Sequence, residues 1–304
     1  MYDKHQRFIT FQAEDGFQVH SLLLSKEFDN KYELSNTPII IHIHGVLGHS
    51  LARGSPRLLP PALLEHGISS FSMNTRMAFV GQIFGEGVFD DAIKDVDAAV
   101  NLLKEEGFRK IFILGYSLGA NIAAHYVAER PDAGLCGLIL EGTAFSLPDS
   151  QKKRWEKWKS IPSYDDVYRK AKDILRPDPY NSPNDQVFIV YRAWGDTFNP
   201  FHQEIYTYKT WWFMRSPEAE NAKTYKLMPK IKVPALFLQG ENDDIVGVWE
   251  GKELARLVRE AGNSEVTVKY IPHAKHDCME NSDETIRTIV GWISSLNSGQ
   301  KIDR

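Results

Sequence analysis

Cysteine is scarce in this chain, and long apolar runs are absent. Only two cysteines, Cys136 and Cys278, occur among 304 residues. Two thiols are too few for the disulfide framework of a small secreted domain, so we expect both to be reduced and the protein to be cytoplasmic. No apolar run approaches the ~18 residues of a transmembrane helix, and the first seven residues show no apolar signal region. We therefore expect no membrane span.

A strong charge of either sign is also lacking. The chain has 36 Lys and Arg residues against 40 Asp and Glu residues, which gives a net charge of −4. Its longest basic cluster, residues 152–154, is too short for a nucleic-acid surface, so we expect no nucleic-acid partner. The hydrophobic fraction of 42% suits one globular unit with a large core, or a core domain that carries an insertion.

What the chain does have is a regular alternation of strand-like and helix-like segments. We expect eight strands, at residues 8–13, 17–25, 38–43, 68–73, 110–114, 135–140, 233–238 and 265–271. Helices are expected at residues 60–66, 90–106, 120–130, 249–261 and 283–296. This order predicts an α/β fold, in which a mostly parallel sheet begins with an antiparallel hairpin and carries helices on both faces. Reactive groups in such sheets gather where the strands end.

One long stretch interrupts the alternation. Residues 142–232 contain no clear buried strand, yet they hold five of the seven tryptophans. Their charged residues and prolines favour short helices over a sheet layer. We interpret this segment as a mainly helical cap over the strand ends, with some of its aromatic side chains lining a pocket. Residues 1–141 and 233–304 would then form the core domain.

A short motif within the core points to chemistry. Gly115-Tyr116-Ser117-Leu118-Gly119 follows an apolar strand-like run and precedes an alanine-rich helix-like segment. A sharp strand-to-helix turn crowds its own backbone, which explains small residues at both ends of the motif. A serine at the apex would expose its hydroxyl beside the first free N–H groups of the helix. The motif thus predicts Ser117 as a nucleophile.

A serine hydroxyl becomes a good nucleophile only when a base takes its proton. His276 follows the last expected strand and is our candidate base, with His273 as the rival. A carboxylate should orient the histidine, and Asp243, three residues after Gly240, is our candidate. Asp244 and Glu141 are the alternative acids. The resulting chain order is serine, acid, histidine.

The oxyanion of the reaction needs two N–H donors. The backbone N–H of Leu118, directly after the nucleophile, is the first candidate. The second should come from the loop that follows the expected strand at residues 38–43, and there we favour the Val46 N–H. His44, at the start of this loop, is interpreted as a structural residue that bonds within the loop.

Together these motifs resemble the α/β-hydrolase superfamily, and in particular the capped carboxylesterases, such as cinnamoyl or feruloyl esterases and monoacylglycerol lipases. The resemblance implies hydrolysis of a small-molecule carboxylic ester, with an apolar or aromatic acyl part, through an acyl-serine. It implies no metal and no cofactor. The matching pieces span residues 44–276: His44-Gly45-x-x-Gly48, Gly115-x-Ser117-x-Gly119, Gly240-x-x-Asp243 and His276.

The chain departs from the family pattern after the expected strand at residues 68–73. Many relatives have a glycine-rich turn there, whereas this chain has Asn74-Thr75-Arg76-Met77. Because that turn lies near the site in the family, the substrate could be unusual. The following residues 78–89 form either a mobile flap or a simple surface loop.

Other functions use the same motifs. A thioesterase, an acyltransferase or a peptidase-like relative would share the nucleophile and its base. A hydrolase-fold receptor or binding protein would share the fold with little turnover. A homodimer is also compatible with the sequence.

Overall fold

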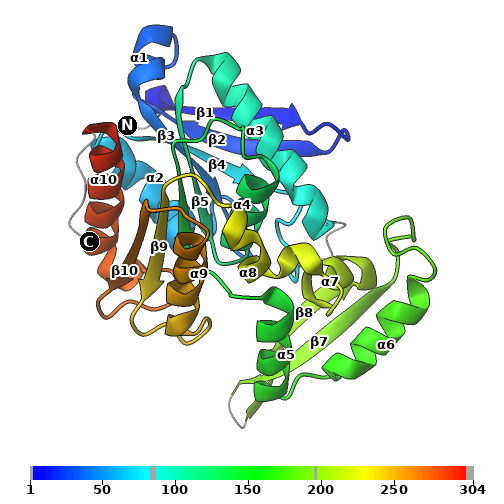
Figure 1. Ribbon diagram of the computed structural model, residues 1–304. Helices are drawn as coiled ribbons and strands as arrows, with labels where there is room; N and C mark the ends of the chain where they lie inside the picture. The colour runs from blue at the N-terminus through cyan, green and yellow to red at the C-terminus, as the bar shows by residue number, and fades with distance from the viewer. Residues whose placement is uncertain (1–2, 83–86, 195–196, 299–304) are drawn as a thin grey trace.

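A mostly parallel sheet forms the centre of the protein. The computed structural model describes residues 3–82, 87–194 and 197–298. These residues form an eight-stranded sheet in the order β1-β2-β4-β3-β5-β6-β9-β10 (Figure 1). Its strands are β1 (Gln6–Gln12), β2 (Gln18–Leu24), β3 (Pro38–Ile43), β4 (Ser69–Asn74), β5 (Lys110–Tyr116), β6 (Gly137–Glu141), β9 (Ala235–Gly240) and β10 (Val266–Ile271). The predicted α/β fold is confirmed.

The direction of the strands brings the predicted reactive loops to one edge. β1 and β2 form the expected antiparallel hairpin, and β2 also pairs antiparallel with β4. β4, β3, β5, β6, β9 and β10 all pair in parallel. Their carboxyl ends therefore share one edge of the sheet, from which the loops after β3, β5, β6, β9 and β10 emerge.

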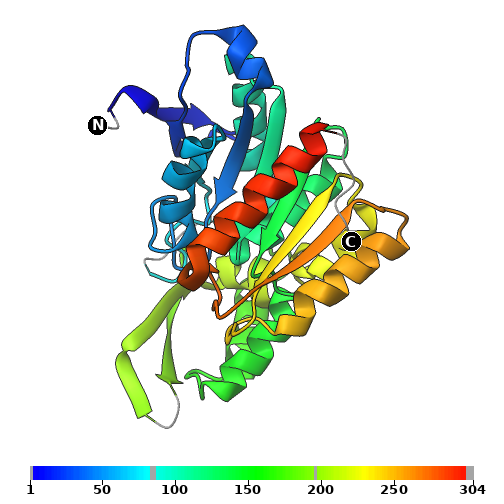
Figure 2. The same cartoon turned by 90° about the vertical axis from the view of Figure 1, so that its left-hand side faces the viewer.

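Helices cover both faces of this sheet (Figure 2). The core helices are α1 (Lys31–Asn36), α2 (Ser55–Glu65), α3 (Ala92–Glu106), α4 (Leu118–Glu129), α9 (Val248–Glu260) and α10 (Ser282–Ser298), with short 3₁₀ turns η1 (Asp3–His5), η2 (Phe89–Asp91) and η5 (Met279–Asn281). α3, α4 and α9 share one apolar core with the sheet, and α2 and α10 share the other. α2 begins five residues before its predicted start. Pro56 lies in its first turn, where a missing N–H leaves no hydrogen bond unmade.

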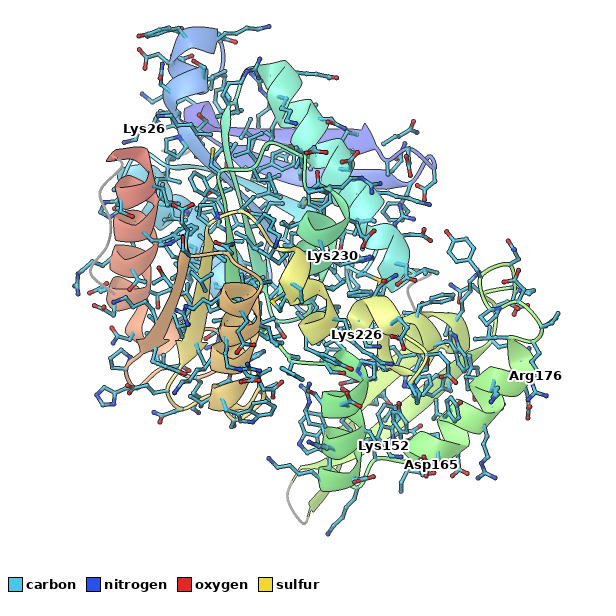
Figure 3. All side chains as sticks on the ribbon, in the orientation of Figure 1. Lys26, Lys152, Asp165, Arg176, Lys226 and Lys230 are labelled. Atoms are coloured by element: carbon cyan, nitrogen blue, oxygen red, sulfur yellow. The ribbon has the colours of Figure 1, made fainter. Side chains whose placement is uncertain are left out.

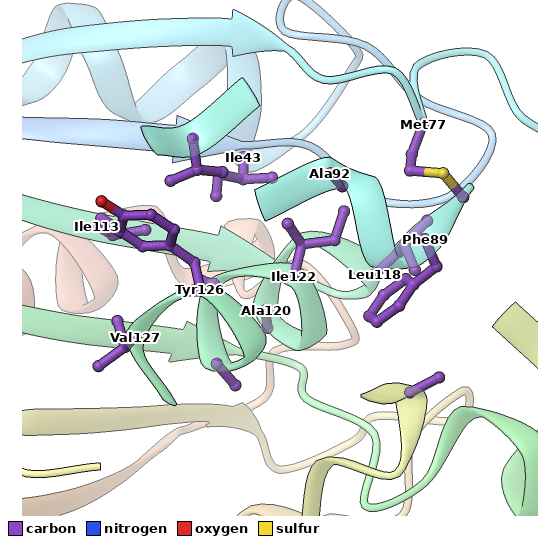
Figure 4. Close-up of a cluster of buried hydrophobic side chains, with 14 of the residues drawn as sticks. Ile43, Met77, Phe89, Ala92, Ile113, Leu118, Ala120, Ile122, Tyr126 and Val127 are labelled. Carbon is purple, nitrogen blue, oxygen red and sulfur yellow. The ribbon is translucent and has the colours of Figure 1, made fainter. Parts of the chain in front are cut away.

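α4 is the most buried helix of the core, and it begins directly after the serine motif. Every residue from Leu118 to Ala128 is buried, so its sequence shows no polar face. Its alanines allow close approach to the sheet, and Figure 4 shows Ile122 and Tyr126 beside Ile43 and Ile113 of β3 and β5. This packing fixes the position of the helix N-terminus next to Ser117.

Most of the segment between β6 and β9 lies outside the sheet, at the lower right of Figure 1, and its last residues, 224–230, pack against α4 and α9. It contains α5 (Leu147–Lys157), α6 (Tyr164–Ile174), α7 (Tyr208–Arg215), α8 (Thr224–Leu227), and the 3₁₀ turns η3 (Glu220–Ala222) and η4 (Met228–Lys230). It also contains an antiparallel hairpin of β7 (Val187–Trp194) and β8 (Thr197–Thr207), which the sequence interpretation did not include. Along β7 the buried Phe188 and Val190 alternate with the exposed Val187 and Ile189, the period of a strand with one covered face.

Aromatic side chains form the core of this segment. Trp155 of α5, Tyr164 of α6 and Trp211 of α7 are all buried and contact one another, with ring centroids 5.3 to 6.3 Å apart. The Tyr164 hydroxyl donates to the Arg215 carbonyl oxygen at 2.6 Å and so links α6 to α7. On the outside, Lys152 and Asp165 form an exposed ion pair between α5 and α6 (Figure 3).

Candidate active site

Ser117 lies at the turn between β5 and α4 in a strained backbone conformation. Its φ of 53° is in the region that favours glycine, and its ψ is −118°. The turn is tight enough to exclude side chains at both neighbouring glycines. A Cβ at Gly115 would lie 2.3 Å from the Gly119 carbonyl oxygen, and one at Gly119 would lie 2.2 Å from the Ile43 carbonyl oxygen. Only glycine fits these two positions, as the sequence motif predicted.

The structure brings Ser117, His276 and Asp243 into one hydrogen-bonded chain. His276 Nε2 lies 2.9 Å from Ser117 Oγ, and His276 Nδ1 lies 2.8 Å from Asp243 Oδ2. Asp243 follows β9 and His276 follows β10, so the three residues come from loops at the same sheet edge. The Tyr116 ring, 5.3 Å from the imidazole, packs against it. This arrangement holds the imidazole between the hydroxyl and the carboxylate.

Asp243 is held as a carboxylate by its surroundings. Its side chain is fully buried. Oδ1 accepts hydrogen bonds from the Ile245 and Val246 N–H groups at 2.9 Å each, and Oδ2 accepts one from Gln239 at 2.6 Å. Burial acts to raise the pKa of Asp243, but the hydrogen bonds and charge of His276, with the two amides, hold it below its usual value. The carboxylate is therefore charged at neutral pH.

The rival residues lie elsewhere. Asp244 and His273 are both exposed to solvent, and neither side chain is hydrogen-bonded to Ser117, His276 or Asp243 among the described residues. Glu141, the last residue of β6, is completely buried. Burial raises the pKa of Glu141 well above its ordinary value, the Ser55 hydroxyl acts in the opposite direction, and the charges of Asp277 and Asp243 raise it further. Burial therefore favours the protonated, neutral form of the Glu141 side chain.

This protonation state predicts how pH affects stability. At pH values between the pKa of Glu141 in the unfolded protein and its higher pKa in the folded protein, the folded protein binds one proton more than the unfolded protein. Its free energy of unfolding therefore falls as the pH rises. Glu141→Gln removes that titration. Relative to the wild type, the variant should therefore gain stability as the pH rises above the ordinary Glu pKa of 4.5, by at most ~1.4 kcal/mol per pH unit. Urea unfolding at several pH values measures this difference.

The exposed Glu105 offers a matched control, because Glu105→Gln alters a carboxylate that faces solvent. The stability difference between this control and the wild type should stay nearly constant over the same pH range. A Glu141→Gln variant that loses stability relative to the wild type as pH rises would mean that Glu141 is ionised in the folded protein.

The two candidate oxyanion donors lie beside Ser117. Val46 and Leu118 line the same small cavity as the serine. Among the described residues, neither of their backbone N–H groups donates a hydrogen bond to another group of the chain. Leu118 is the first residue of α4, where backbone N–H groups have no acceptor within the helix. Both groups are thus free to bind an anion.

His44 braces the loop that carries Val46. Its Nδ1 donates to the Gly45 carbonyl oxygen at 3.0 Å, and its Nε2 accepts from the Thr75 N–H at 3.2 Å, roles that follow from the partners. Burial lowers the pKa of His44 to about 4, so the ring is neutral. It bonds within its loop, as interpreted from the sequence, and also across to the loop after β4.

The residues that depart from the family pattern also hold this loop in place. Asn74 Oδ1 accepts from the Ser50 N–H at 2.7 Å, and the Phe79 N–H donates to the Gly48 carbonyl oxygen at 2.8 Å. Arg76 does not bond to this loop through its guanidinium, which forms ion pairs with Asp95 and Asp15 at 2.7 Å each. The turn is therefore a brace behind the site, and Arg76 does not line the cavity.

The proposed flap, residues 78–89, is described only in part, because residues 83–86 lie outside the described residues. The Leu47 N–H donates to the Val80 carbonyl oxygen at 3.1 Å, and the Ile205 N–H of β8 donates to the Gly81 carbonyl oxygen at 3.0 Å. Val80 and Phe89 are buried. The described part of this segment thus connects the Val46 loop to the β7–β8 hairpin.

The cavity above Ser117 is small, about 30 Å³, and combines residues of the core with residues of α5 and α7. Its described lining consists of Val46, Ser117, Leu118, Asn121, Ala144, Leu147, Gln151, Arg154, Met214, Arg215 and Val246. No aromatic side chain is among them. The expectation that aromatic residues of the insertion line the pocket is not met in this cavity, because those side chains pack against one another.

The described residues lack two further features. They contain no group of His, Cys, Asp or Glu side chains arranged to hold a metal ion. They also contain no helix with the length and apolar character needed to cross a membrane.

The chain is similar to known hydrolases in sequence pattern and in fold. Residues 37–178 match the family described as "Serine aminopeptidase, S33", and residues 186–299 match the prolyl oligopeptidase family. Among solved structures, an esterase from Pyrococcus furiosus is 15% identical with a TM-score of 0.61, over 95% of this chain and 90% of that one. A monoacylglycerol lipase from Paleococcus ferrophilus is 17% identical with a TM-score of 0.62, over 92% and 100%.

A third solved structure is similar over nearly the full length of both chains. Est1E from Butyrivibrio proteoclasticus is 16% identical with a TM-score of 0.61, over 96% of this chain and 99% of that one. At identities of 15% to 17%, these similarities show the fold alone. Together with the strand order of the sheet, they show that the chain has the α/β-hydrolase fold.

Proposed function

We propose that the protein cleaves a small carboxylic ester through an acyl-serine intermediate. The observation that carries this proposal is the hydrogen-bonded chain from Ser117 Oγ through His276 to Asp243, with distances of 2.9 and 2.8 Å. The hydrolase families and esterase-type neighbours support ester hydrolysis as the general activity. The roles of the individual residues follow from their chemistry.

In the first half of the reaction, Ser117 Oγ attacks the ester carbonyl carbon while His276 Nε2 takes the hydroxyl proton. Asp243 stabilises the imidazolium and fixes its orientation. The Val46 and Leu118 N–H groups bind the oxyanion of the tetrahedral intermediate, each worth ~3 kcal/mol. When the intermediate collapses, the bond to the alcohol oxygen breaks and His276 gives that oxygen its proton.

The second half repeats these steps with water. His276 takes a proton from a water molecule that attacks the acyl carbon, and the same two N–H groups bind the new oxyanion. The bond to Ser117 Oγ then breaks, the proton returns to the serine, and the carboxylic acid leaves. No step needs a metal or a cofactor.

We assign residues 142–232 the role of a cap over this site. Leu147 of α5 and Met214 of α7 line the cavity opposite Ser117 and Leu118. With Val246 they supply an apolar wall for an acyl chain. A cavity of about 30 Å³ favours a short acyl part over a long one.

Peptide-bond cleavage is the main competing activity, because both matched families are named for peptidases. An aminopeptidase must bind the ammonium group of its substrate, and a carboxylate beside the nucleophile would serve that purpose. Among the described residues that line the cavity there is no carboxylate, and two are arginines. This lining disfavours an N-terminal ammonium, and so supports ester substrates over peptides.

The test is to compare the hydrolysis rates of three compounds that share the butanoyl group and differ in the leaving group: methyl butanoate, a butanoyl thioester and butanamide. We expect the ester to be hydrolysed, and the amide to react at least ~100-fold more slowly, which corresponds to ~2.7 kcal/mol in the barrier. Preference for the amide would point to a peptidase, and preference for the thioester to a thioesterase. A folded protein that turns over none of the three would favour a binding role.

A further inference from the structure

The wall of the cavity opposite Ser117 is cationic. Arg154 of α5 and Arg215, the last residue of α7, both line it. Arg154 is half-buried, and its Nε donates to the Ser150 carbonyl oxygen of its own helix at 3.2 Å. Among the described residues Arg154 has no carboxylate within 4 Å. Burial, followed by the nearby charges of Arg215 and Arg192, lowers the pKa of Arg154 to about 10, so it is still a cation at neutral pH.

Arg215 is more deeply buried, and among the described residues it donates no hydrogen bond to a carboxylate. Only 5% of the residue is exposed. The guanidinium stacks over the Tyr206 ring at 4.7 Å, and its Nη1 lies 3.8 Å from Glu204 Oε2, too far for a hydrogen bond. Within the described part of the chain, Nη1 has no hydrogen-bond acceptor. Leaving a buried charged donor without an acceptor is costly, so such a group marks a binding site for an anion.

The carboxylates near these two arginines are already engaged. Glu204 accepts hydrogen bonds from Arg192 at 2.6 Å and from the Tyr206 hydroxyl. Glu250 accepts from the Phe145 and Gly247 N–H groups at 2.7 and 2.8 Å, at the start of α9. Arg192 and Arg215 therefore share one carboxylate, Glu204, and the described residues that line the cavity include two arginines and no carboxylate.

Other buried polar atoms in the cavity wall also lack hydrogen-bond partners within the described part of the chain. The side-chain nitrogen of Gln151 is buried without an acceptor, and Gln151 lines the cavity beside Arg154. Asn121 Oδ1 is a buried acceptor without a donor, whereas its Nδ2 donates to the Ala144 carbonyl oxygen at 2.9 Å. Donors thus outnumber acceptors around the cavity, as suits a group rich in oxygen and negative charge.

We propose that Arg154 and Arg215 select an ester that carries a carboxylate within a few bonds of its reacting carbonyl. The proposal deepens the ester hydrolysis proposed above and rests on it. Arg154 and Arg215 would bind the carboxylate, while Leu147, Met214 and Val246 contact the short chain between the two groups. A cavity of about 30 Å³ suits a carboxylate better than a long acyl tail.

The carboxylate can be on either side of the ester bond, and two substrate pairs separate these cases. On the acyl side, monomethyl glutarate is compared with methyl 4-carbamoylbutanoate, in which a neutral amide replaces the carboxylate. On the alcohol side, 3-acetoxypropanoate is compared with 3-acetoxypropanamide. In one of the two pairs, kcat/KM for the carboxylate should exceed that for the amide by at least ~10-fold.

Variants at Arg154 test the source of this preference. Arg154→Met keeps the length of the side chain without its charge, and should lower the carboxylate-to-amide ratio roughly 10- to 100-fold. Arg154→Lys keeps the charge without the two-pronged geometry and should give an intermediate ratio. Arg169→Met is the matched control, because Arg169 is an exposed arginine of α6 that pairs with Asp166, and it should leave the ratio unchanged.

A binding measurement separates this inference from the proposed function. Glutarate should bind to the Ser117→Ala protein by calorimetry, and the added Arg154→Met change should weaken that binding at least ~10-fold. Two results would overturn the inference and leave the proposed ester hydrolysis standing. In the first, the enzyme hydrolyses the carbamoyl-substituted esters as fast as both carboxylate esters. In the second, it prefers a carboxylate ester, but Arg154→Met leaves that preference unchanged. Arg154-dependent glutarate binding with no hydrolysis of any ester would overturn the proposed function and keep the anion site.

Discussion

Ser117→Ala should reduce the rate of ester hydrolysis by ~10⁶-fold, close to the loss seen when the nucleophile of a complete triad is removed. The alanine has no oxygen to form the acyl intermediate, and His276 Nε2 loses its only hydrogen-bond partner among the described residues. The two oxyanion donors remain, so a weak hydrolysis by water can persist. Initial rates on the best ester of the panel measure the effect.

The control for this variant is Ser294→Ala, at an exposed serine of α10 far from the cavity. It should keep wild-type activity. Both variants should show the wild-type circular dichroism spectrum, because alanine is close in size to serine at either position. A folded Ser117→Ala protein that keeps more than a tenth of the activity would rule out the acyl-serine mechanism.

Asp243→Asn should lower kcat by ~10⁴-fold while leaving the fold intact. The Ile245 and Val246 N–H groups need an acceptor, so the Asn oxygen should take the place of Oδ1. The amide nitrogen then faces His276 Nδ1 and donates to it. This forces the imidazole proton onto Nε2, which can no longer accept the proton of Ser117.

Asp244→Asn provides a matched comparison, because it makes the same change at the next residue, where the side chain is exposed. That variant should keep activity within a few-fold of the wild type. Equal losses in the two variants would contradict the role given to Asp243. So would an Asp243→Asn enzyme whose kcat is unchanged.

The sequence predicted the hydrogen-bonded chain well, for a physical reason. Ser117, Asp243 and His276 each follow a buried strand, and parallel strands bring their carboxyl ends to one edge of a sheet. Glycine also marks the sharpest turn, because a Cβ at Gly115 or Gly119 would collide with backbone atoms. Features coded by local turns and strand ends can therefore be inferred without knowing the tertiary packing.

The cationic wall of the cavity could not be inferred in this way. Arg154 belongs to a basic cluster, residues 152–154, that the sequence interpretation treated only as too short for nucleic acid. In the structure Lys152 faces solvent and pairs with Asp165, while Arg154 points toward the cavity. Arg215 comes from another helix, and no spacing along the chain relates the two arginines. Their meeting depends on how α5 and α7 pack.

The turn after β4 was also difficult to interpret from sequence. Asn74, Thr75 and Arg76 replace a glycine-rich turn of the family, and an unusual substrate was the expectation. The structure instead gives Asn74 and Thr75 the task of bracing the Val46 loop, and Arg76 a buried ion-pair network with Asp95. The departure is explained by support of the site.

The most direct test of the central claim is to label the native protein with a fluorophosphonate and locate the modified residue by mass spectrometry. Activated serines react with this reagent because a neighbouring base removes their proton. We predict one phosphonyl group on Ser117 in the wild type, and no label at this site in the Asp243→Asn or Ser117→Ala proteins on the same timescale. An unmodified Ser117 in active wild-type enzyme, or a label on another serine, would contradict the account.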